Sequence, residues 1–187
     1  MQAETVGRPI APGQNEYRIV DENREEEVPT GTPGELAARG PGIVPGYFRN
    51  AEENAENVDG DGWFYTEDIL ERGGDGNFRV HGRKKDTIIR GGENIYAPGI
   101  ENVLIEHPAG ENVAVVGKPD DRLGERPFAF VKLVEGVDTI SLEELNGLLD
   151  EEGMAVFKRP EGVAIVDEFP RTSVEKISKK DLLDRFE

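Results

Sequence analysis

Positive charge gathers in one short stretch of an otherwise acidic sequence. The 187 residues hold 39 Asp and Glu against 22 Lys and Arg, which gives a formal net charge of -17. Between Arg79 and Arg90, however, five basic residues accompany a single acid, Asp86. A positive region in a negative chain attracts anionic ligands such as phosphates. A solvated strand edge would have the same composition, so charge alone leaves both interpretations open.

Two glycines follow this basic stretch at once. Gly91 and Gly92 tolerate positive φ and leave their backbone N–H groups open to an approaching ligand. The sequence therefore predicts either a loop that bends into a binding site or a tight turn after a strand.

The order of residues from Gly82 to Tyr96 resembles the hinge and glycine-loop motif of the adenylate-forming enzymes. This superfamily includes acyl-CoA synthetases, aryl-acid AMP ligases, nonribosomal peptide adenylation domains and luciferases. The resemblance implies that a mobile domain swings about Asp86, although a surface-turn aspartate would look the same. It also implies that Gly91, Gly92 and Glu93 form the loop that enters the active site for thioester formation.

A second stretch, residues 62–68, resembles the superfamily motif Gly-Trp-x-x-Thr-Gly-Asp. A carboxylate can accept two hydroxyl hydrogen bonds, so the resemblance implies that Asp68 binds the ribose of a nucleotide. It also implies that the planar guanidinium of Arg83 contacts the ribose or a phosphate. A strand-end aspartate and a surface arginine are the plainer alternatives. Glu67 departs from the motif, because it stands where the superfamily has glycine.

A third stretch, residues 170–177, resembles the motif Pro-x-Thr-x-x-Gly-Lys-Ile, which implies that Lys176 is the catalytic lysine of adenylation. Its ammonium would bridge the substrate carboxylate and the α-phosphate as negative charge builds in the transition state. Lys179 and Lys180 are nearby alternatives. Glu175 replaces the motif's glycine, and it would strain the loop if that position needs positive φ.

The elements that must carry these residues fall into two parts. Residues 1–85 read as short strands and turns with few large apolar residues, which the resemblance identifies as the β-rich end of a large N-terminal domain. Asn50 is placed to cap a helix over 50–57, and Asp75-Gly76 predicts a type I′ hairpin turn. Strands are expected at 16–21, 35–40, 63–70 and 78–82.

Residues 86–187 are expected to form an α+β domain, a three-stranded sheet packed by helices, which the resemblance identifies as the mobile C-terminal domain. Alternating or apolar runs predict the strands, and helical spacing predicts the helices. Ser141 and Ser178 are the expected caps of the last two helices. The strands are expected at 111–116, 127–134 and 162–166, and the helices at 98–107, from Ser141, and from Ser178 through Leu182, Leu183 and Phe186.

Composition excludes several classes of function. There is no cysteine and there are only two histidines, so disulfides, thiolate zinc sites and any dedicated metal site are not expected. No broad basic face is available for nucleic acid, and no apolar run is long enough to span a membrane. The cytoplasm is the default compartment. The acid-rich, lysine-poor balance favours adaptation to high salt, with ordinary solubility as the alternative.

The resemblance implies an ATP-dependent ligase that converts a small aryl or acyl carboxylic acid to an acyl-AMP and then to a thioester. ATP and Mg²⁺ would serve the first step, and CoA or carrier-protein pantetheine would accept the acyl group. Arg90-Gly91-Gly92-Glu93 and Phe157-Lys158-x-Pro160 resemble the 2,3-dihydroxybenzoate-AMP ligase-like branch most.

The superfamily's phosphate loop, adenine-binding segment and acyl pocket have no counterpart in this sequence. We therefore expect the chain to need an N-terminal adenylation domain, to be inactive alone and to hold no cofactor tightly. A stand-alone binding or regulatory module is the alternative.

Overall fold

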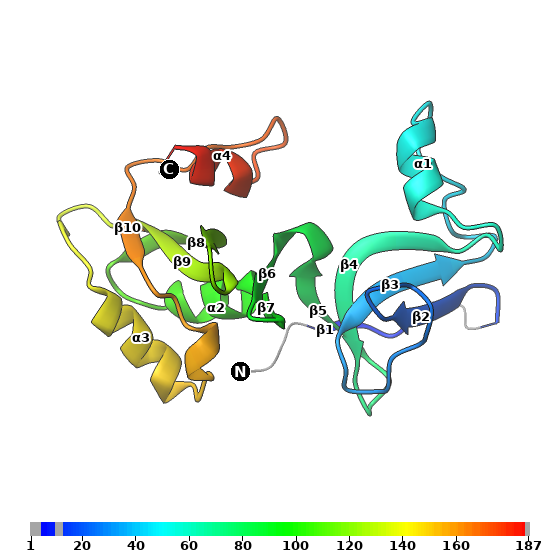
Figure 1. The fold of residues 1–187 in the computed structure, drawn as a ribbon, viewed down its shortest axis with the longest axis horizontal. Coiled ribbons are helices and arrows are strands. Elements are labelled where there is room, and N and C mark those ends of the chain that lie inside the picture. Colours follow the sequence, from blue (N-terminus) through cyan, green and yellow to red (C-terminus); the bar gives the residue numbers. More distant parts are fainter. Residues whose placement is uncertain (1–4, 10–12, 186–187) are drawn as a thin grey trace. The chain divides into compact units, whose positions relative to one another are not determined.

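The computed structural model describes residues 5–9 and 13–185, and Figure 1 follows the chain through them. Contacts divide the chain into two compact units, and the boundary falls between Lys85 and Asp86. Each unit has its own five-stranded sheet, and each is described by itself.

The first unit is an antiparallel sheet with the strand order β1-β5-β4-β3-β2. The four expected strands are β2 to β5, and β1 is a further strand that the sequence did not predict. The helix expected after Asn50 is also present, and the Asn50 side chain accepts a hydrogen bond from the Glu53 N–H at 3.3 Å. The elements are β1 (Thr5–Gly7), β2 (Glu16–Val20), β3 (Gly34–Arg39), α1 (Ala51–Asn57), β4 (Phe64–Arg72) and β5 (Phe78–Arg83), followed by the 3-10 turn η1 (Lys84–Asp86).

The turn between β4 and β5 is not the predicted type I′ hairpin. Type I′ needs positive φ at both central residues, whereas Gly76 has a φ of 80° and Asp75 has no positive φ. The Gly73 N–H donates to the Asn77 carbonyl and the Gly76 N–H donates to the Gly73 carbonyl, each at 2.9 Å. This pattern is a three-residue loop that ends in one left-handed residue.

The second unit is α+β, as the sequence predicts. The three expected strands are β8, β9 and β10, and a hairpin of β6 and β7 widens the sheet to five strands because Arg90 pairs with Gly124 at the start of β9. β10 is parallel to β9, and the other pairs are antiparallel. The elements are β6 (Thr87–Arg90), β7 (Glu93–Tyr96), α2 (Ala97–Leu104), β8 (Gly110–Asp120), β9 (Gly124–Leu133), α3 (Leu142–Glu151), the 3-10 turn η2 (Val156–Lys158), β10 (Val163–Ile165) and α4 (Lys179–Asp184).

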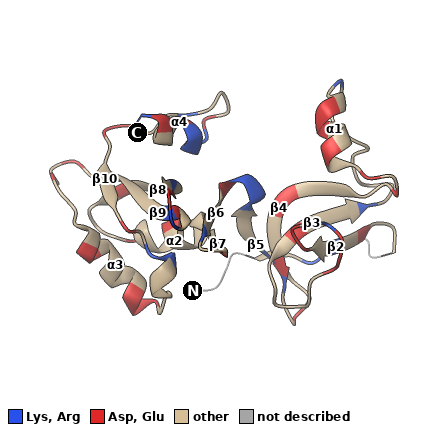
Figure 2. Cartoon of the chain, viewed as in Figure 1, with Lys and Arg blue, Asp and Glu red and all other residues tan. Residues whose placement is uncertain are grey.

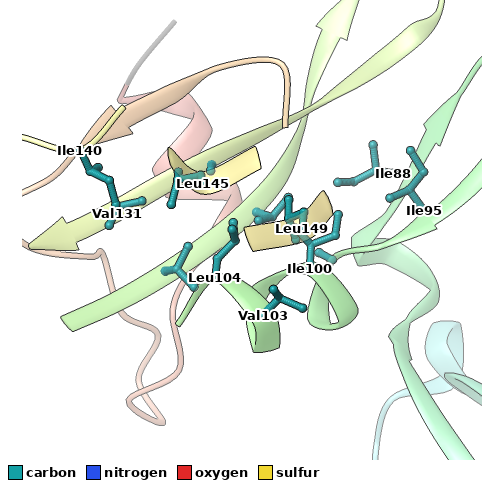
Figure 3. Close-up of a cluster of buried hydrophobic side chains, with 13 residues drawn as sticks. Ile88, Ile95, Ile100, Val103, Leu104, Val131, Ile140, Leu145 and Leu149 are labelled. Carbon is teal, nitrogen blue, oxygen red and sulfur yellow. The ribbon is translucent and has the colours of Figure 1, made fainter. Parts of the chain in front are cut away.

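The main core of this unit lies where α2 and α3 pack on the sheet (Figure 3). Burying an aliphatic side chain of this size contributes about 1.5–3 kcal/mol, so this cluster is the chief source of stability in the unit. Its labelled members are Ile88, Ile95, Ile100, Val103, Leu104, Val131, Ile140, Leu145 and Leu149.

The helix ends follow local chemistry. Ser141 and Glu144 form both bonds of a capping box at the start of α3. α2 ends at Leu104 rather than at the predicted His107. The N–H groups of Glu106 and His107 donate to carbonyls three residues back, and Pro108 has no N–H with which to continue the helix. Ser178 caps α4 by accepting from the Asp181 N–H at 3.4 Å. Phe186, expected on this helix, lies outside the described residues.

Candidate functional site

A bulge in β4 surrounds the first candidate residues. Residues 66–68 stand opposite Leu36 alone, between two regular pairs of β3 and β4. Glu67, at the centre of the bulge, has a φ of 59°. The Thr66 hydroxyl closes the bulge, because it donates to the Leu36 carbonyl at 3.0 Å and accepts from the Asp68 N–H at 3.2 Å. Such bulges re-aim side chains that strand alternation would otherwise point to opposite faces.

As a result, two consecutive carboxylates reach one guanidinium. Asp68 is the cross-strand partner of Arg83, and its Oδ1 lies 3.2 Å from Nη1 of Arg83. Oε2 of Glu67 accepts from Nη2 of the same arginine at 2.9 Å. Partial burial alone would lower the pKa of Arg83, but the hydrogen bond that it donates to Glu67 and the charges of both acids raise it. The structure therefore brings Asp68 and Arg83 together, and it adds Glu67 as a partner that the sequence did not reveal.

The basic stretch of the sequence is not a free basic surface. In Figure 2 the part of this stretch that follows β5 is a blue segment, in a chain with more red than blue. Besides Arg83, Arg79 pairs with Glu71 at 3.4 Å, and Lys84 pairs with Glu35 at 3.0 Å. Arg90 pairs in the same way with Glu161 at 2.6 Å. Each of these four cations is therefore paired with an acid, and this weakens the case for a stand-alone anion-binding module.

The predicted hinge residue sits at the boundary of the two units. Asp86 ends η1, the single 3-10 turn between β5 and β6, and the division into compact units falls directly before it. The position suits a hinge, and the role of Asp86 stays a prediction.

The glycine pair forms a regular hairpin turn between β6 and β7. Gly91 and Gly92 have φ of 59° and 88°, as a two-residue type I′ turn requires at both positions. Gly91, Gly92 and Glu93 are exposed, and the Gly91 N–H donates to the Leu123 carbonyl at 2.7 Å. The turn is thus a defined projection of the sheet.

One carboxylate anchors this hairpin. Glu161 accepts from Nε of Arg90 at 2.8 Å and also pairs with Arg126. Burial would raise the pKa of Glu161, but the hydrogen bonds from Arg90 and Arg126 lower it. The carboxylate therefore stays ionised and ties the turn to the start of β9.

The predicted catalytic lysine lies in a short hairpin loop before α4. The Thr172 N–H donates to the Lys176 carbonyl at 2.7 Å, and the Glu175 N–H donates to the Thr172 carbonyl at 3.0 Å. Glu175 has a φ of 62°, so the loop does require the left-handed conformation that glycine adopts at least cost. Lys176 is exposed, and its ammonium forms no ion pair within residues 5–9 and 13–185.

Lys179 has a different task. Its Nζ lies 2.7 Å from Oε1 of Glu101 and donates to the Val115 carbonyl at 3.0 Å. The same Glu101 oxygen accepts from the Val115 N–H at 2.7 Å. Lys179 thus fastens α4 to α2 and β8, whereas Lys180 is exposed at the helix surface.

The described part of the chain contains neither a candidate metal site nor a candidate membrane-spanning helix. Within it, no three His, Asp or Glu side chains are grouped so that they could hold a metal ion. Over the same residues, no helix has the length and apolar character needed to cross a membrane.

Comparison with known proteins gives matches in both units. Residues 99–176 match the AMP-binding enzyme C-terminal domain, and residues 1–48 match the AMP-binding enzyme family. Pyochelin synthase PchD of Pseudomonas aeruginosa is 44% identical over 181 residues, 97% of this chain and 32% of the relative. The 2,3-dihydroxybenzoate-AMP ligase of Bacillus subtilis is 40% identical over 95% of this chain and 32% of its own length.

A solved structure agrees with these matches. ATP-bound MatB from Rhodopseudomonas palustris superimposes with a TM-score of 0.80 and 31% identity, over 92% of this chain and 34% of that one. The chain therefore spans about a third of the length of the relatives it matches.

Proposed function

This chain belongs to the adenylate-forming superfamily, and we propose that it works as the C-terminal part of an ATP-dependent ligase that activates a carboxylic acid. The parent enzyme forms an acyl-AMP and pyrophosphate, and then transfers the acyl group to a pantetheine thiol of CoA or a carrier protein. The name of the Bacillus relative favours an aryl acid as substrate, in line with the motifs around Gly91 and Phe157.

The observation that carries this proposal is the exposed Lys176 in its hairpin loop. A lysine without an ion-pair partner among the described residues does not have to leave an acid before it contacts an incoming anion. In the adenylation step, we assign to that ammonium the bridge between the substrate carboxylate and the α-phosphate, where it stabilises the negative charge of the transition state. Lys179 suits this role less, because its ammonium already binds Glu101 and Val115.

Asp68 and Arg83 form the proposed nucleotide contact. Asp68 would accept hydrogen bonds from the ribose hydroxyls, and Arg83 would orient that carboxylate and approach a phosphate. Their side chains are 41% and 42% exposed, so both remain reachable by a ligand. Glu67 competes for the same guanidinium, which sets this chain apart from relatives with glycine there.

For the thioester step we propose that the domain after Asp86 rotates and that the Gly91-Gly92 turn replaces Lys176 at the site. A rigid turn without side chains suits a narrow pantetheine channel, since its backbone can approach closely. Among the described residues no three His, Asp or Glu side chains are grouped to hold a metal ion, and we assign no step of this chain to Mg²⁺.

A chimera tests the proposal. This chain would replace the matching third of the Bacillus 2,3-dihydroxybenzoate-AMP ligase, and the intact Bacillus enzyme would be the control. We expect acid-dependent ATP–pyrophosphate exchange and thioester formation from the chimera, and neither from the 187-residue chain alone. A folded chimera without exchange, or exchange by the isolated chain above a protein-free blank, would refute the assignment.

A further inference from the structure

Glu35 is the most deeply buried acid of the described chain. The residue is 2% exposed, and its side chain lies under the β4 bulge. A buried carboxylate must be paired and hydrogen-bonded, or its burial is very costly. Glu35 meets that demand with four hydrogen bonds, two at each oxygen.

Two of the four bonds come from Arg24. Its Nε donates to Oε2 at 2.9 Å and its Nη2 donates to Oε1 at 2.8 Å, which is the strong bidentate arrangement of an arginine and a carboxylate. Burial would raise the pKa of Glu35, but the bonds from Arg24 and Lys84 lower it. The group is therefore a carboxylate at neutral pH.

The other two bonds reach the residues beside the proposed nucleotide contact. The N–H of Glu67, the left-handed residue at the centre of the bulge, donates to Oε1 at 3.1 Å. Nζ of Lys84, the residue directly after Arg83, donates to Oε2 at 3.0 Å. One carboxylate thus holds the neighbour of Asp68 on β4 and the neighbour of Arg83 at the end of β5.

From this geometry we infer that Glu35 is a positioning residue, which holds the β4 bulge and thereby aims Asp68 and Arg83 at each other and at the nucleotide. The nucleotide part of this inference rests on the proposed function. Charge neutralisation does not require the bond to Glu67, because Arg24 alone satisfies the carboxylate with a bidentate pair. A left-handed glutamate is unfavourable by itself, and the hydrogen bond from its N–H stabilises that conformation.

The first experiment measures amide hydrogen exchange in the 187-residue chain with Glu35→Gln. Because charge-assisted hydrogen bonds are lost, exchange at the Glu67 amide should accelerate by about 10- to 100-fold. The amides of the β2–β3 pair should change much less. Asn57→Ala is the control: it removes a 3.3 Å bond to Arg24 and leaves the bond from Glu67 in place. Equal acceleration at all amides, or an equal response at Glu67 in the control, would overturn the inference.

The second experiment uses the chimera and compares Glu35→Gln with Asp68→Ala. Both should raise KM for ATP about tenfold or more, the effect of losing one charge-assisted bond, with KM for the acid unchanged. If Asp68→Ala raises KM for ATP and Glu35→Gln does not, Glu35 does not position the pair. If Asp68→Ala has no effect, the proposed nucleotide contact fails, and the exchange experiment alone decides the role of Glu35.

A second variant covers the case in which Glu35→Gln does not fold. Lys84→Met keeps the bidentate Arg24 pair and removes the bond from the residue next to Arg83, together with a 3.4 Å bond from Lys84 to the Glu22 carbonyl. It should raise KM for ATP by about threefold or more, since a net hydrogen bond contributes at least ~0.5–1.5 kcal/mol, without changing KM for the acid. An unchanged KM for ATP in this variant would contradict the inference.

Discussion

Two loops of this protein have the same backbone geometry, but one has glycine and the other has glutamate at the left-handed position. In residues 73–77 and again in residues 172–176, the first N–H donates to the fifth carbonyl and the fourth N–H donates to the first carbonyl. The fourth residue is left-handed in both, with a φ of 80° at Gly76 and 62° at Glu175. A left-handed side-chain residue costs roughly 1–2 kcal/mol, so the second loop carries a strain that the first avoids.

The residue after the left-handed position also differs. In the first loop, Asn77 turns its amide back to Asp75 at 2.9 Å, so the loop satisfies its own polar groups. In the second loop, Lys176 is exposed and its ammonium has no ion-pair partner among the described residues. The same turn can therefore close a hairpin with its polar groups paired, or it can expose a cation. The proposed catalytic loop is the more strained of the two.

Salt should produce the largest shift in stability and should leave the difference between the loops intact. At a net charge of -17, self-repulsion opposes the compact state until salt screens it. We expect Tm to rise markedly between dilute buffer and molar KCl in thermal melts. Because the loop strain is steric, the Tm difference between Glu175→Gly and Glu175→Gln, which carry the same charge, should not depend on KCl. A flat or falling Tm would refute the salt requirement.

Exchanging the left-handed residues should give smaller, opposite shifts. Gly76→Glu should destabilise the first unit by about 1–2 kcal/mol, or ~4–16 °C in Tm for a unit of this size. A Cβ at Gly76 would meet only Nε of Arg8, at 3.8 Å, so backbone strain is the expected cause. Glu175→Gly should stabilise the second unit by a smaller amount, since glycine also gains entropy in the unfolded chain.

Gly74→Glu is the matched control for this exchange. It adds the same charge to the same loop, at a glycine with open space around it and no positive φ. If Gly74→Glu and Gly76→Glu lower Tm equally, then charge and not conformation explains the loss, and the comparison of the two loops fails.

The smallest effect should come from Asp75 in the first loop. Hydrogen bonds from the backbone and the side chain of Asn77 lower the pKa of Asp75. Its contribution to stability is therefore present above its unfolded pKa of about 3.9 and is lost as pH falls through the lower folded value. Asp75→Asn should lower Tm slightly at pH 6. It should not lower Tm at a pH where Asp75 is protonated in both the folded and the unfolded chain. A Tm difference that persists unchanged to pH 2 would contradict this assignment.

Local chemistry explains which parts of the fold the sequence predicts well. The Ser141 capping box involves residues only three apart, and its signal is complete in the sequence. The two strands that follow α2, β8 and β9, can also be predicted from their apolar content. Glu175 is a further case. It stands where the superfamily motif has glycine, and its φ in the structure is positive, as a glycine position can require.

Contacts between distant residues explain what the sequence did not reveal. The β4 bulge depends on the register between β3 and β4, which no local pattern specifies. Arg90 pairs with Glu161, 71 residues away. The sequence around Arg90 therefore did not show that an acid neutralises its charge. Glu35 lay in a segment recognised only as a strand, and its four bonds come from positions 11 to 49 residues distant.

The most direct test of the central claim is the rate of acid-dependent ATP–pyrophosphate exchange by the chimera carrying Lys176→Ala. We predict a loss of about 10²–10³-fold, the effect of removing one preorganised charge from the transition state. Thioester formation from a pre-made acyl-adenylate should be largely spared. Lys179→Ala is the control, and it should lower stability more than rate because it breaks the tie to Glu101 and Val115. Exchange that survives Lys176→Ala but disappears with Lys179→Ala or Lys180→Ala would contradict the account.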